Sequence, residues 1–245
     1  MDTSFILFSC FAFLSYFSAA FAGFGGVIIV LTLGAHLYPI KWMLPILLPL
    51  TLIANAYIFI RHHKYVDTSV LFKRILPFMG TGLVIGFTLF NLLHGELLRK
   101  AFGVLVILVA IRELINLIRG NQEKDLRLPR WLSTAYIFAA GLIHGVYASG
   151  GPVLVYTVNK MQLEKSVFRS TLSMVWLSMN IFLTASYAIA GKVNLESLKV
   201  SAYLMPSLII GVLAGEILHQ RIPERFFKIA VFVLLMLSGI FISLK

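Results

Sequence analysis

Hydrophobic positions fill long stretches of this chain that contain no Asp, Glu, Lys or Arg, and short polar connections separate them. A helix needs about 20 apolar residues to cross the hydrocarbon core of a bilayer. Several of the stretches approach or exceed this length: 3–40, 42–60, 75–93, 131–159 and 229–244. The pattern predicts an all-α polytopic membrane protein.

The same pattern predicts five helices in each half of the chain. They cover roughly 4–22, 25–37, 42–60, 75–93 and 98–117, and then 131–147, 150–159, 167–189, 197–218 and 226–244. The second helix of each half is short, because paired glycines interrupt the apolar run where it begins.

The glycine pairs belong to a duplicated segment. Residues 22–30 read AGFGGVIIV, and residues 147–155, which lie 125 positions later, read YASGGPVLV. Further landmarks recur in the same order: Asn55 with Asn180, and Pro77, Gly82 and Gly86 with Pro206, Gly211 and Gly215. Repeats of this kind signal architecture. We expect a first repeat over 1–120, a cytoplasmic linker over 121–130 and a second repeat over 131–245, all in one membrane domain.

Composition agrees with a membrane protein and narrows the function classes. Only 13% of the residues are charged and the mean hydropathy is +0.91, whereas soluble domains carry about 25% charged residues. The net charge is +11, but the Lys and Arg residues lie singly or in pairs at the ends of the expected helices. This distribution is typical of residues that set membrane topology and not of a nucleic-acid-binding surface. Cys10 is the single cysteine, which excludes an internal disulfide and a thiolate metal cluster.

Residues 1–22 have no basic residue ahead of their apolar run, so we expect a retained helix and not a signal peptide.

The distribution of basic residues predicts how the chain crosses the membrane. If each glycine-broken segment makes one crossing, the 21 Lys and Arg residues split 12 against 9. If each segment enters and returns, fifteen lie on one side and six on the other, which is the bias expected for cytoplasmic loops. The returning arrangement puts both termini outside. It also adds an odd number of crossings per repeat, so the fold class we expect is two inverted repeats, each a glycine-broken helical hairpin plus three transmembrane helices.

On these residues the chain resembles the TauE/SafE sulfite exporter family of membrane permeases. The resemblance rests on Gly23-Phe24-Gly25-Gly26 and Ser149-Gly150-Gly151-Pro152, on the helix with polar positions after each motif, and on the length. It implies a bacterial inner-membrane permease that moves sulfite, sulfonates or related sulfur-containing anions. The two half-sites differ chemically, because Leu44 stands in the first half where the second half has Arg169.

The glycine pairs are the first candidate for anion binding. Gly25 and Gly26 begin one short helix, and Gly150 and Gly151 begin the other. Helix N-termini offer free N–H groups and a partial positive charge, and glycine lets a ligand approach the backbone. Two such N-termini could converge on one site between the repeats. The alternative is that the glycines only allow tight helix packing or the turn itself.

A polar stripe on the helix after each hairpin is the second candidate. Arg169, Ser173, Trp176 and Asn180 fall on one face of the predicted helix 167–189, and polar stripes in membrane helices seldom face lipid. The first-half counterparts are Thr51 and Asn55, and Ser149 adds a hydroxyl beside the second glycine pair. The asparagines could instead hold the helices together by hydrogen bonds, and Arg169 could anchor a helix end at the interface.

Other features of the chain leave the coupling and the partners open. Glu113 and Glu216 lie about a turn inside helix ends and could bind protons, but ion pairs with Arg112 and Arg221 are the simpler explanation. Histidines such as His144 are expected to be structural, and Ser149 and His144 are badly spaced for a hydrolase pair on one helix. We expect no enzyme activity and no cofactor or metal. The expected partners are a small anionic substrate and the lipid bilayer, not nucleic acid, with a homodimer left open. A permease for an unrelated solute and a non-transporting membrane scaffold remain the alternatives.

The topology can be tested by cysteine-accessibility labelling in cells. Single cysteines placed at 61–64 and 121–127 should be reached only from the cytoplasm, whereas cysteines at Lys192 and the C-terminus should be labelled from outside. Labelling of residues 61–64 and Lys192 from the same side would rule out the returning hairpins.

Overall fold

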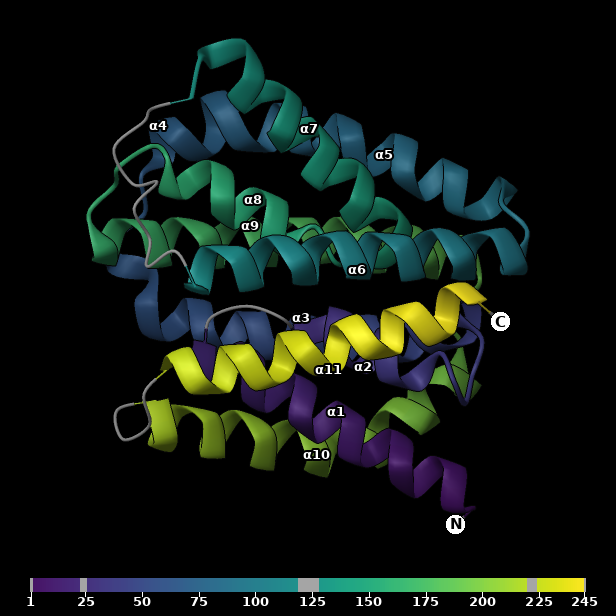
Figure 1. Cartoon of the computed structure of the whole chain (residues 1–245). Helices are drawn as coiled ribbons and strands as arrows, with labels where there is room; N and C mark the ends of the chain where they lie inside the picture. Colours follow the sequence, from purple (N-terminus) through teal and green to yellow (C-terminus); the bar gives the residue numbers. More distant parts are fainter. Residues whose placement is uncertain (1, 23–25, 119–127, 220–223, 245) are drawn as a thin grey trace. The chain divides into compact units, whose positions relative to one another are not determined.

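The computed structural model describes residues 2–22, 26–118, 128–219 and 224–244. The side chains at 22, 61, 62, 165, 166, 169, 219 and 224–228 lie outside this description. All regular elements in the described residues are helical (Figure 1). The helices are α1 (Thr3–Ala22), α2 (Gly26–Gly34), α3 (Ile40–His62), α4 (Thr68–Val70), α5 (Leu76–Leu92), α6 (Gly95–Ile118), α7 (Arg130–Tyr147), α8 (Gly151–Asn159), α9 (Lys165–Ile189), α10 (Leu195–His219) and α11 (Glu224–Leu244).

Each helix expected from the sequence is present, with one clear shift of boundary. The helix expected to begin at 75 is preceded by α4 and a π-helical stretch, Leu71–Ile75, so the helical run starts at Thr68. The expected start at 75 came from Lys73 and Arg74, which directly precede the charge-free stretch 75–93. The actual start is set by Asp67, whose carboxylate accepts a hydrogen bond from the Val70 amide at 2.9 Å, as N-cap residues do.

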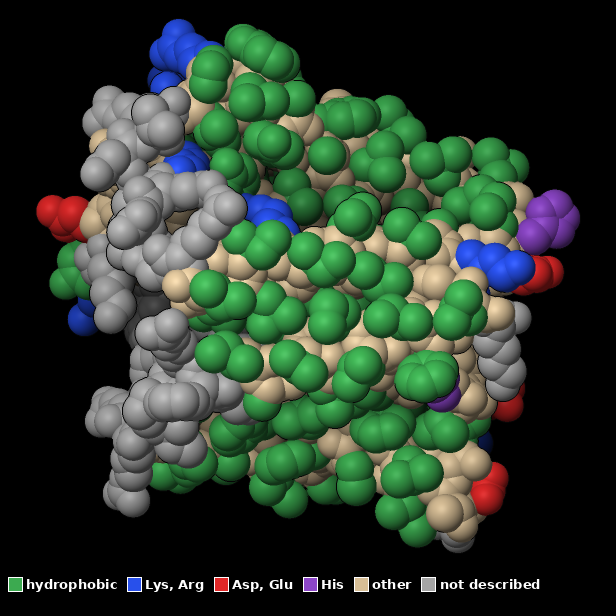
Figure 2. All heavy atoms as spheres, viewed as in Figure 1, with side chains coloured by type: hydrophobic (Ala, Val, Ile, Leu, Met, Phe, Trp, Pro, Cys, Tyr) green, Lys and Arg blue, Asp and Glu red, His purple; other side chains and the backbone are tan. Residues whose placement is uncertain are grey.

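The chain is a polytopic α-helical membrane protein. Six helical segments in the described part are long and apolar enough to cross a membrane, among them those that α1, α3, α6 and α10 provide. Large apolar side chains remain on the helix exteriors, for instance Leu108 on α6 and Phe241 on α11, which are 61% and 65% exposed. Figure 2 shows hydrophobic side chains along α6 and α11, with Lys and Arg near helix ends. Such a surface is stable only against lipid or another apolar partner.

The helices form two compact units, and each unit combines segments from both halves of the sequence. The first contains Met1–Leu47, Leu93–Gln122 and Leu198–Lys245, and the second contains Leu48–Leu92 and Glu123–Ser197. Helix α3 passes from the first unit to the second after Leu47. Each unit contains one of the two glycine-broken hairpins.

In the first unit, the hairpin of α1 and α2 returns to the level at which it started. A Cβ on Gly26, at the start of α2, would lie 3.4 Å from the Ala19 side chain near the end of α1. After α2, Tyr38 and Trp42 pack on Phe8 near the start of α1, with ring centroids 5.4 and 6.0 Å away. The chain therefore goes in along α1 and comes back along α2, as the loop charges predicted. Helix α2 is buried along its length from Val27 to Gly34.

In the second unit, α7 and α8 form the equivalent hairpin. The turn is made by Ala148, which has a left-handed backbone (φ 51°) and whose amide bonds the His144 carbonyl at 2.7 Å. Tyr156 on α8 then packs edge-on against Tyr136 near the start of α7, at 5.8 Å. Both hairpins thus return, which supports an odd number of crossings in each half. The inverted relation of the two halves stays a prediction.

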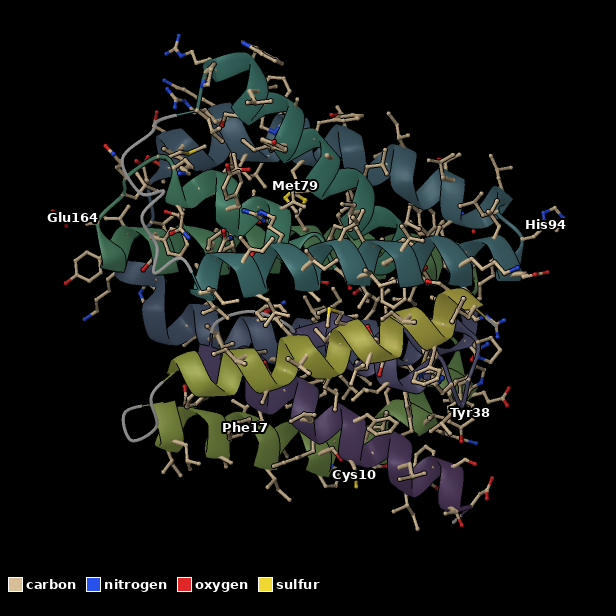
Figure 3. All side chains as sticks on the ribbon, in the orientation of Figure 1. Cys10, Phe17, Tyr38, Met79, His94 and Glu164 are labelled. Atoms are coloured by element: carbon tan, nitrogen blue, oxygen red, sulfur yellow. The ribbon has the colours of Figure 1, made fainter. Side chains whose placement is uncertain are left out.

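Glycines bring α5 and α7 into backbone contact inside the second unit. A Cβ on Gly82 would lie 2.2 Å from the Phe138 carbonyl oxygen, and one on Gly141 would lie 2.0 Å from the Met79 carbonyl oxygen. Figure 3 places Met79 at this part of α5, and its side chain is fully buried. Small residues allow membrane helices to approach closely and gain dispersion energy that lipid tails cannot offer.

The duplicated glycines Gly211 and Gly215 make the same kind of contact in the first unit. A Cβ on Gly211 would lie 2.8 Å from the Phe13 carbonyl oxygen of α1, and one on Gly215 would lie 2.6 Å from the Phe17 carbonyl oxygen. In both units, therefore, the fourth helix of one half packs through its glycines on the first helix of the other half. This recurrence supports the internal duplication.

Gly82→Ala should lower the stability of the folded protein, because the added methyl group has no space beside the α7 backbone. Overpacking of this kind typically costs about 1–3 kcal/mol. Gly80→Ala is the matched control on the same helix, since a Cβ there meets nothing within 4 Å. Thermal unfolding of the purified variants in detergent should show a lower melting temperature for Gly82→Ala only. Equal melting temperatures for the two variants would contradict the close approach of α5 and α7.

Candidate anion-binding site

A cluster of buried polar side chains lies where α7, α8 and α9 meet in the second unit. His144, Ser173 and Asn180 are only 2%, 6% and 2% exposed. Within the described residues, neither ring nitrogen of His144 has a hydrogen-bond partner, nor does the Ser173 hydroxyl or the Asn180 side-chain oxygen. The Asn180 side chain lies beside the His144 ring and interacts with it. Buried polar groups without partners cost about 1–3 kcal/mol each, so such a concentration marks a place that a polar ligand could satisfy.

Trp176 forms one wall of this cluster. Its ring lies 5.7 Å from the His144 ring at an interplanar angle of 32°. The sequence placed Ser173, Trp176 and Asn180 on one face of a helix, and the structure brings that face to the hairpin. The side-chain amide of Asn180 donates to the Trp176 carbonyl oxygen at 2.8 Å, which holds the amide group in position and leaves its oxygen directed elsewhere.

The N-terminus of α8 adds backbone donors beside Trp176. Gly151 begins this nine-residue helix, and the amides of Gly151 and Val153 have no partner within the helix, whereas Pro152 between them has no N–H to offer. A Cβ on Gly151 would meet only the far edge of the Trp176 ring, at 3.9 Å. The backbone here is thus open toward the indole, and the N-terminal end of the α8 dipole points to the polar cluster.

Gly150 and Gly151 have different surroundings. A Cβ on Gly150 would lie 2.1 Å from the Ala140 carbonyl oxygen, so this glycine allows α8 to pack on α7. Gly151 has free space instead. Neither supplies the left-handed turn, which is made by Ala148. The packing explanation of the glycine motif therefore applies to Gly150, and the anion-binding explanation stays a prediction for Gly151.

Ser149 and Arg169 are the two remaining residues of the second half that the sequence predicted to bind the anion. Ser149 is buried and its hydroxyl donates to the Tyr147 carbonyl oxygen at 2.8 Å, so its proton is already engaged. Arg169 lies on α9 one turn before Ser173, but its side chain is outside the described residues.

The first-half candidates are divided between the two units. Gly26 begins α2 in the first unit, where its carbonyl oxygen accepts a hydrogen bond from the Ser15 hydroxyl; Gly25 lies outside the described residues. Thr51 and Asn55 are half-buried on the part of α3 that belongs to the second unit. Their role in an anion site remains a prediction.

Comparison with known proteins identifies the family. The sequence profile described as "Sulfite exporter TauE/SafE" matches residues 8–242, nearly the whole chain. The chain belongs to the TauE/SafE family. It is also 26% identical over 167 residues, 68% of each chain, to a Comamonas testosteroni protein named "Probable inner membrane transporter protein TsaS". No solved structure matches it. This TauE/SafE protein is accordingly a multi-pass membrane transporter, and the resemblance inferred from the glycine motifs is confirmed.

His144 is the residue of this TauE/SafE site that sequence reasoning missed. A lone histidine was expected to be a hydrogen-bonded structural residue; within the described part its ring nitrogens meet no partner at full hydrogen-bond geometry, and the Asn180 side chain is the polar group beside them. The useful signal was its spacing: His144 lies seven residues before Gly151, so folding the hairpin brings the two together. The stripe on α9 also continues further than expected, since the side-chain hydroxyls of the half-buried Thr184 and the buried Tyr187 are inaccessible and have no partner among the described residues.

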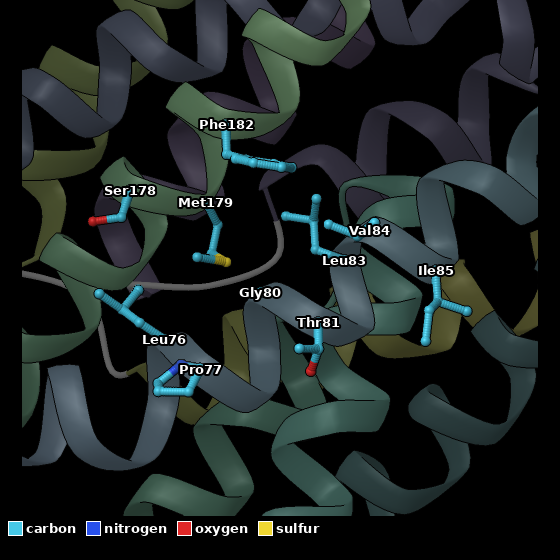
Figure 4. Close-up of a pocket in the computed structure, with 10 residues that line it drawn as sticks. All are labelled: Leu76, Pro77, Gly80, Thr81, Leu83, Val84, Ile85, Ser178, Met179 and Phe182. Carbon is cyan, nitrogen blue, oxygen red and sulfur yellow. The ribbon is translucent and has the colours of Figure 1, made fainter.

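An apolar groove in the same unit has the wrong chemistry for an anion. It holds about 630 Å³ between α5 and α9, and it is lined by apolar residues with Gly80, Thr81 and Ser178 (Figure 4). Thr81 and Ser178 donate their hydroxyl protons to the carbonyl oxygens of Phe78 and Met174. The groove therefore presents no available donor from these two residues, and it suits an acyl chain or an apolar side chain better than an anion.

Asn180→Ala should weaken anion binding by this TauE/SafE protein without unfolding it. Losing one hydrogen bond to a charged ligand costs about 1.5–3 kcal/mol, or roughly 10- to 100-fold in affinity. Gly151→Leu should have a larger effect, because its side chain would fill the space beside Trp176. Calorimetric titration of the purified variants with sulfite measures both effects.

Ser173→Ala should also weaken anion binding. Its matched control is Ser178→Ala, which should bind the anion like the wild type. Both serines lie on α9, but the Ser178 hydroxyl is bonded within its own helix and faces the apolar groove. If Asn180→Ala and Gly151→Leu melt and bind like the wild type, the anion site is elsewhere.

Proposed function

We propose that this chain is a permease for a small sulfur-containing anion, such as sulfite or an organosulfonate, and that it works by alternating access. The observation that carries the proposal is the set of buried polar groups near the start of α8: backbone amides, the His144 ring, the Ser173 hydroxyl and the Asn180 amide, whose second N–H is left to donate beside the bond to Trp176. Family membership supports the same substrate class, because the family's description names sulfite.

The donor chemistry favours an oxyanion. A sulfite or sulfonate group presents three oxygens that accept hydrogen bonds and carry delocalised charge. Neutral donors and a helix N-terminus stabilise such a charge without the desolvation penalty of a buried lysine or arginine. Helices α7, α8 and α9 contain no Asp or Glu, so a cation would find no carboxylate on these helices.

Arg169 could contribute at the margin of the site. It precedes Ser173 by one helical turn, so both positions share a face of α9. A guanidinium group binds oxyanions in a bidentate manner, which an ammonium group cannot reproduce. The alternative, an anchor at the interface, requires only a positive charge there.

Low exposure of the cluster supports a transport cycle in which the site is closed at one stage. With each of the three polar side chains at most 6% exposed, an anion can enter only if helices move apart. The turn at Ala148 is a suitable place for such a movement, since a non-glycine residue in the left-handed region stores about 1–2 kcal/mol of strain.

Flux measurements test the substrate class. Proteoliposomes containing the purified protein should take up radiolabelled sulfite or a small sulfonate above the level of empty liposomes, and unlabelled sulfite should compete. Arg169→Lys should keep most of the flux if the arginine is an anchor and lose it if the arginine binds the anion. Preferential transport of a cation, or the absence of any anion flux from folded protein, would refute the proposed function.

A further inference from the structure

A basic cavity of about 680 Å³ lies in the second unit, away from the polar cluster. It is bounded by α4, the π-helical stretch before α5, the start of α7 and the end of α8. Four cationic side chains line it, against the single carboxylate of Asp67: Lys73, Arg74, Arg130 and Lys160. Figure 2 shows Lys and Arg side chains at the end of this unit where α7 begins. None of these residues belongs to the proposed transport site.

The carboxylate in this cavity does little to neutralise it. One carboxylate oxygen of Asp67 accepts a hydrogen bond from the Val70 amide, and the backbone amide of Asp67 donates to the Thr171 hydroxyl at 3.0 Å. Asp67 therefore acts as a helix cap. Salt bridges between it and the cavity cations are not found among the described side chains. The cavity is left with an excess of positive charge.

Lys160 is the most unusual of the four cations, because it is only 8% exposed. It follows the last turn of α8, where the carbonyl end of the helix favours a cation, and its ammonium lies 5.8 Å from the Tyr156 ring centroid. These contacts explain how a buried lysine is tolerated. They do not explain why three further cations from α7 and the region before α5 are gathered around the same space.

The surroundings of the cavity are those of a membrane–water interface. Trp131, next to Arg130, is 72% exposed, and Phe72, next to Lys73, is 59% exposed. Aromatic side chains of this kind sit at the level of lipid headgroups. Basic pockets between helices at that level suit phosphorylated headgroups. The hydroxyls of Ser69 and Ser133 add hydrogen-bonding groups to the lining.

We propose that this cavity binds a phosphate group, presented by the headgroup of an anionic phospholipid or by free phosphate. Its volume is far larger than a sulfite ion needs, and its several cations match a ligand with more charge than the neutral donors beside α8 can hold. The exposed aromatic residues beside it favour the lipid as the source. The proposal does not depend on the identity of the transported anion.

Native mass spectrometry of the purified full-length protein tests this, with phosphatidylglycerol, phosphatidylcholine and inorganic phosphate as separate probes. The wild type should bind phosphatidylglycerol in preference to phosphatidylcholine. The double variant Lys73→Gln/Arg130→Gln should bind phosphatidylglycerol about tenfold more weakly or worse. Both side chains are exposed, so the variant should fold, and a thermal melt checks this.

Lys64→Gln is the matched control, since Lys64 is an exposed cation of the same unit that does not line the cavity. It should keep the phosphatidylglycerol affinity of the wild type. Binding of inorganic phosphate with the same sensitivity to the double variant would support the phosphate site and assign it to the free ion. Equal losses in the control and the double variant, no loss in either, or displacement of phosphatidylglycerol by sulfite would overturn the proposal.

Discussion

A bilayer core offers no hydrogen bonds, so any break in a membrane helix has to be enclosed by protein. This protein contains two such breaks, before α2 and before α8, and the rest of each unit is arranged to cover them. Helix α2 is buried from Val27 to Gly34. Around α8, the Gly150 contact with α7 and the Gly82 and Gly141 contacts between α5 and α7 remove the space that lipid would otherwise fill.

Enclosing a broken helix also produces the conditions for anion binding. The start of α8 lies against Trp176 of α9, on the helix face that also carries Ser173 and Asn180. In that setting hydrogen bonds are strong and unpaired groups are costly. An anion bound as we propose would give these groups hydrogen-bond partners, provided the helices can separate to admit it. The same low-dielectric surroundings would favour neutral donors over full positive charges at the proposed anion site.

Interleaving of the two halves links the hairpins to helices that come late in the opposite half. Within the second unit, α7 packs on α5, and within the first unit α1 packs on α10, in both cases through a pair of glycines four residues apart. Each hairpin therefore depends on a helix that the other half of the sequence supplies. A single half could not enclose its own broken helix in this way, which explains why both repeats occur in one chain.

Sequence by itself determined the helical membrane class, almost every helix boundary and the family. It also determined that Ser173, Trp176 and Asn180 share a helix face. These features follow from hydrophobic spacing and glycine pairs, which are local signals. Tertiary structure decided which glycine packs and which leaves space, since Gly150 and Gly151 are identical until Ala140 and Trp176 are placed beside them. It also decided the importance of His144, whose lack of a partner among the described residues depends on the fold of α7, α8 and α9. The basic cavity likewise needed the fold, because Lys73, Arg130 and Lys160 are far apart in the chain and only packing brings their charges together.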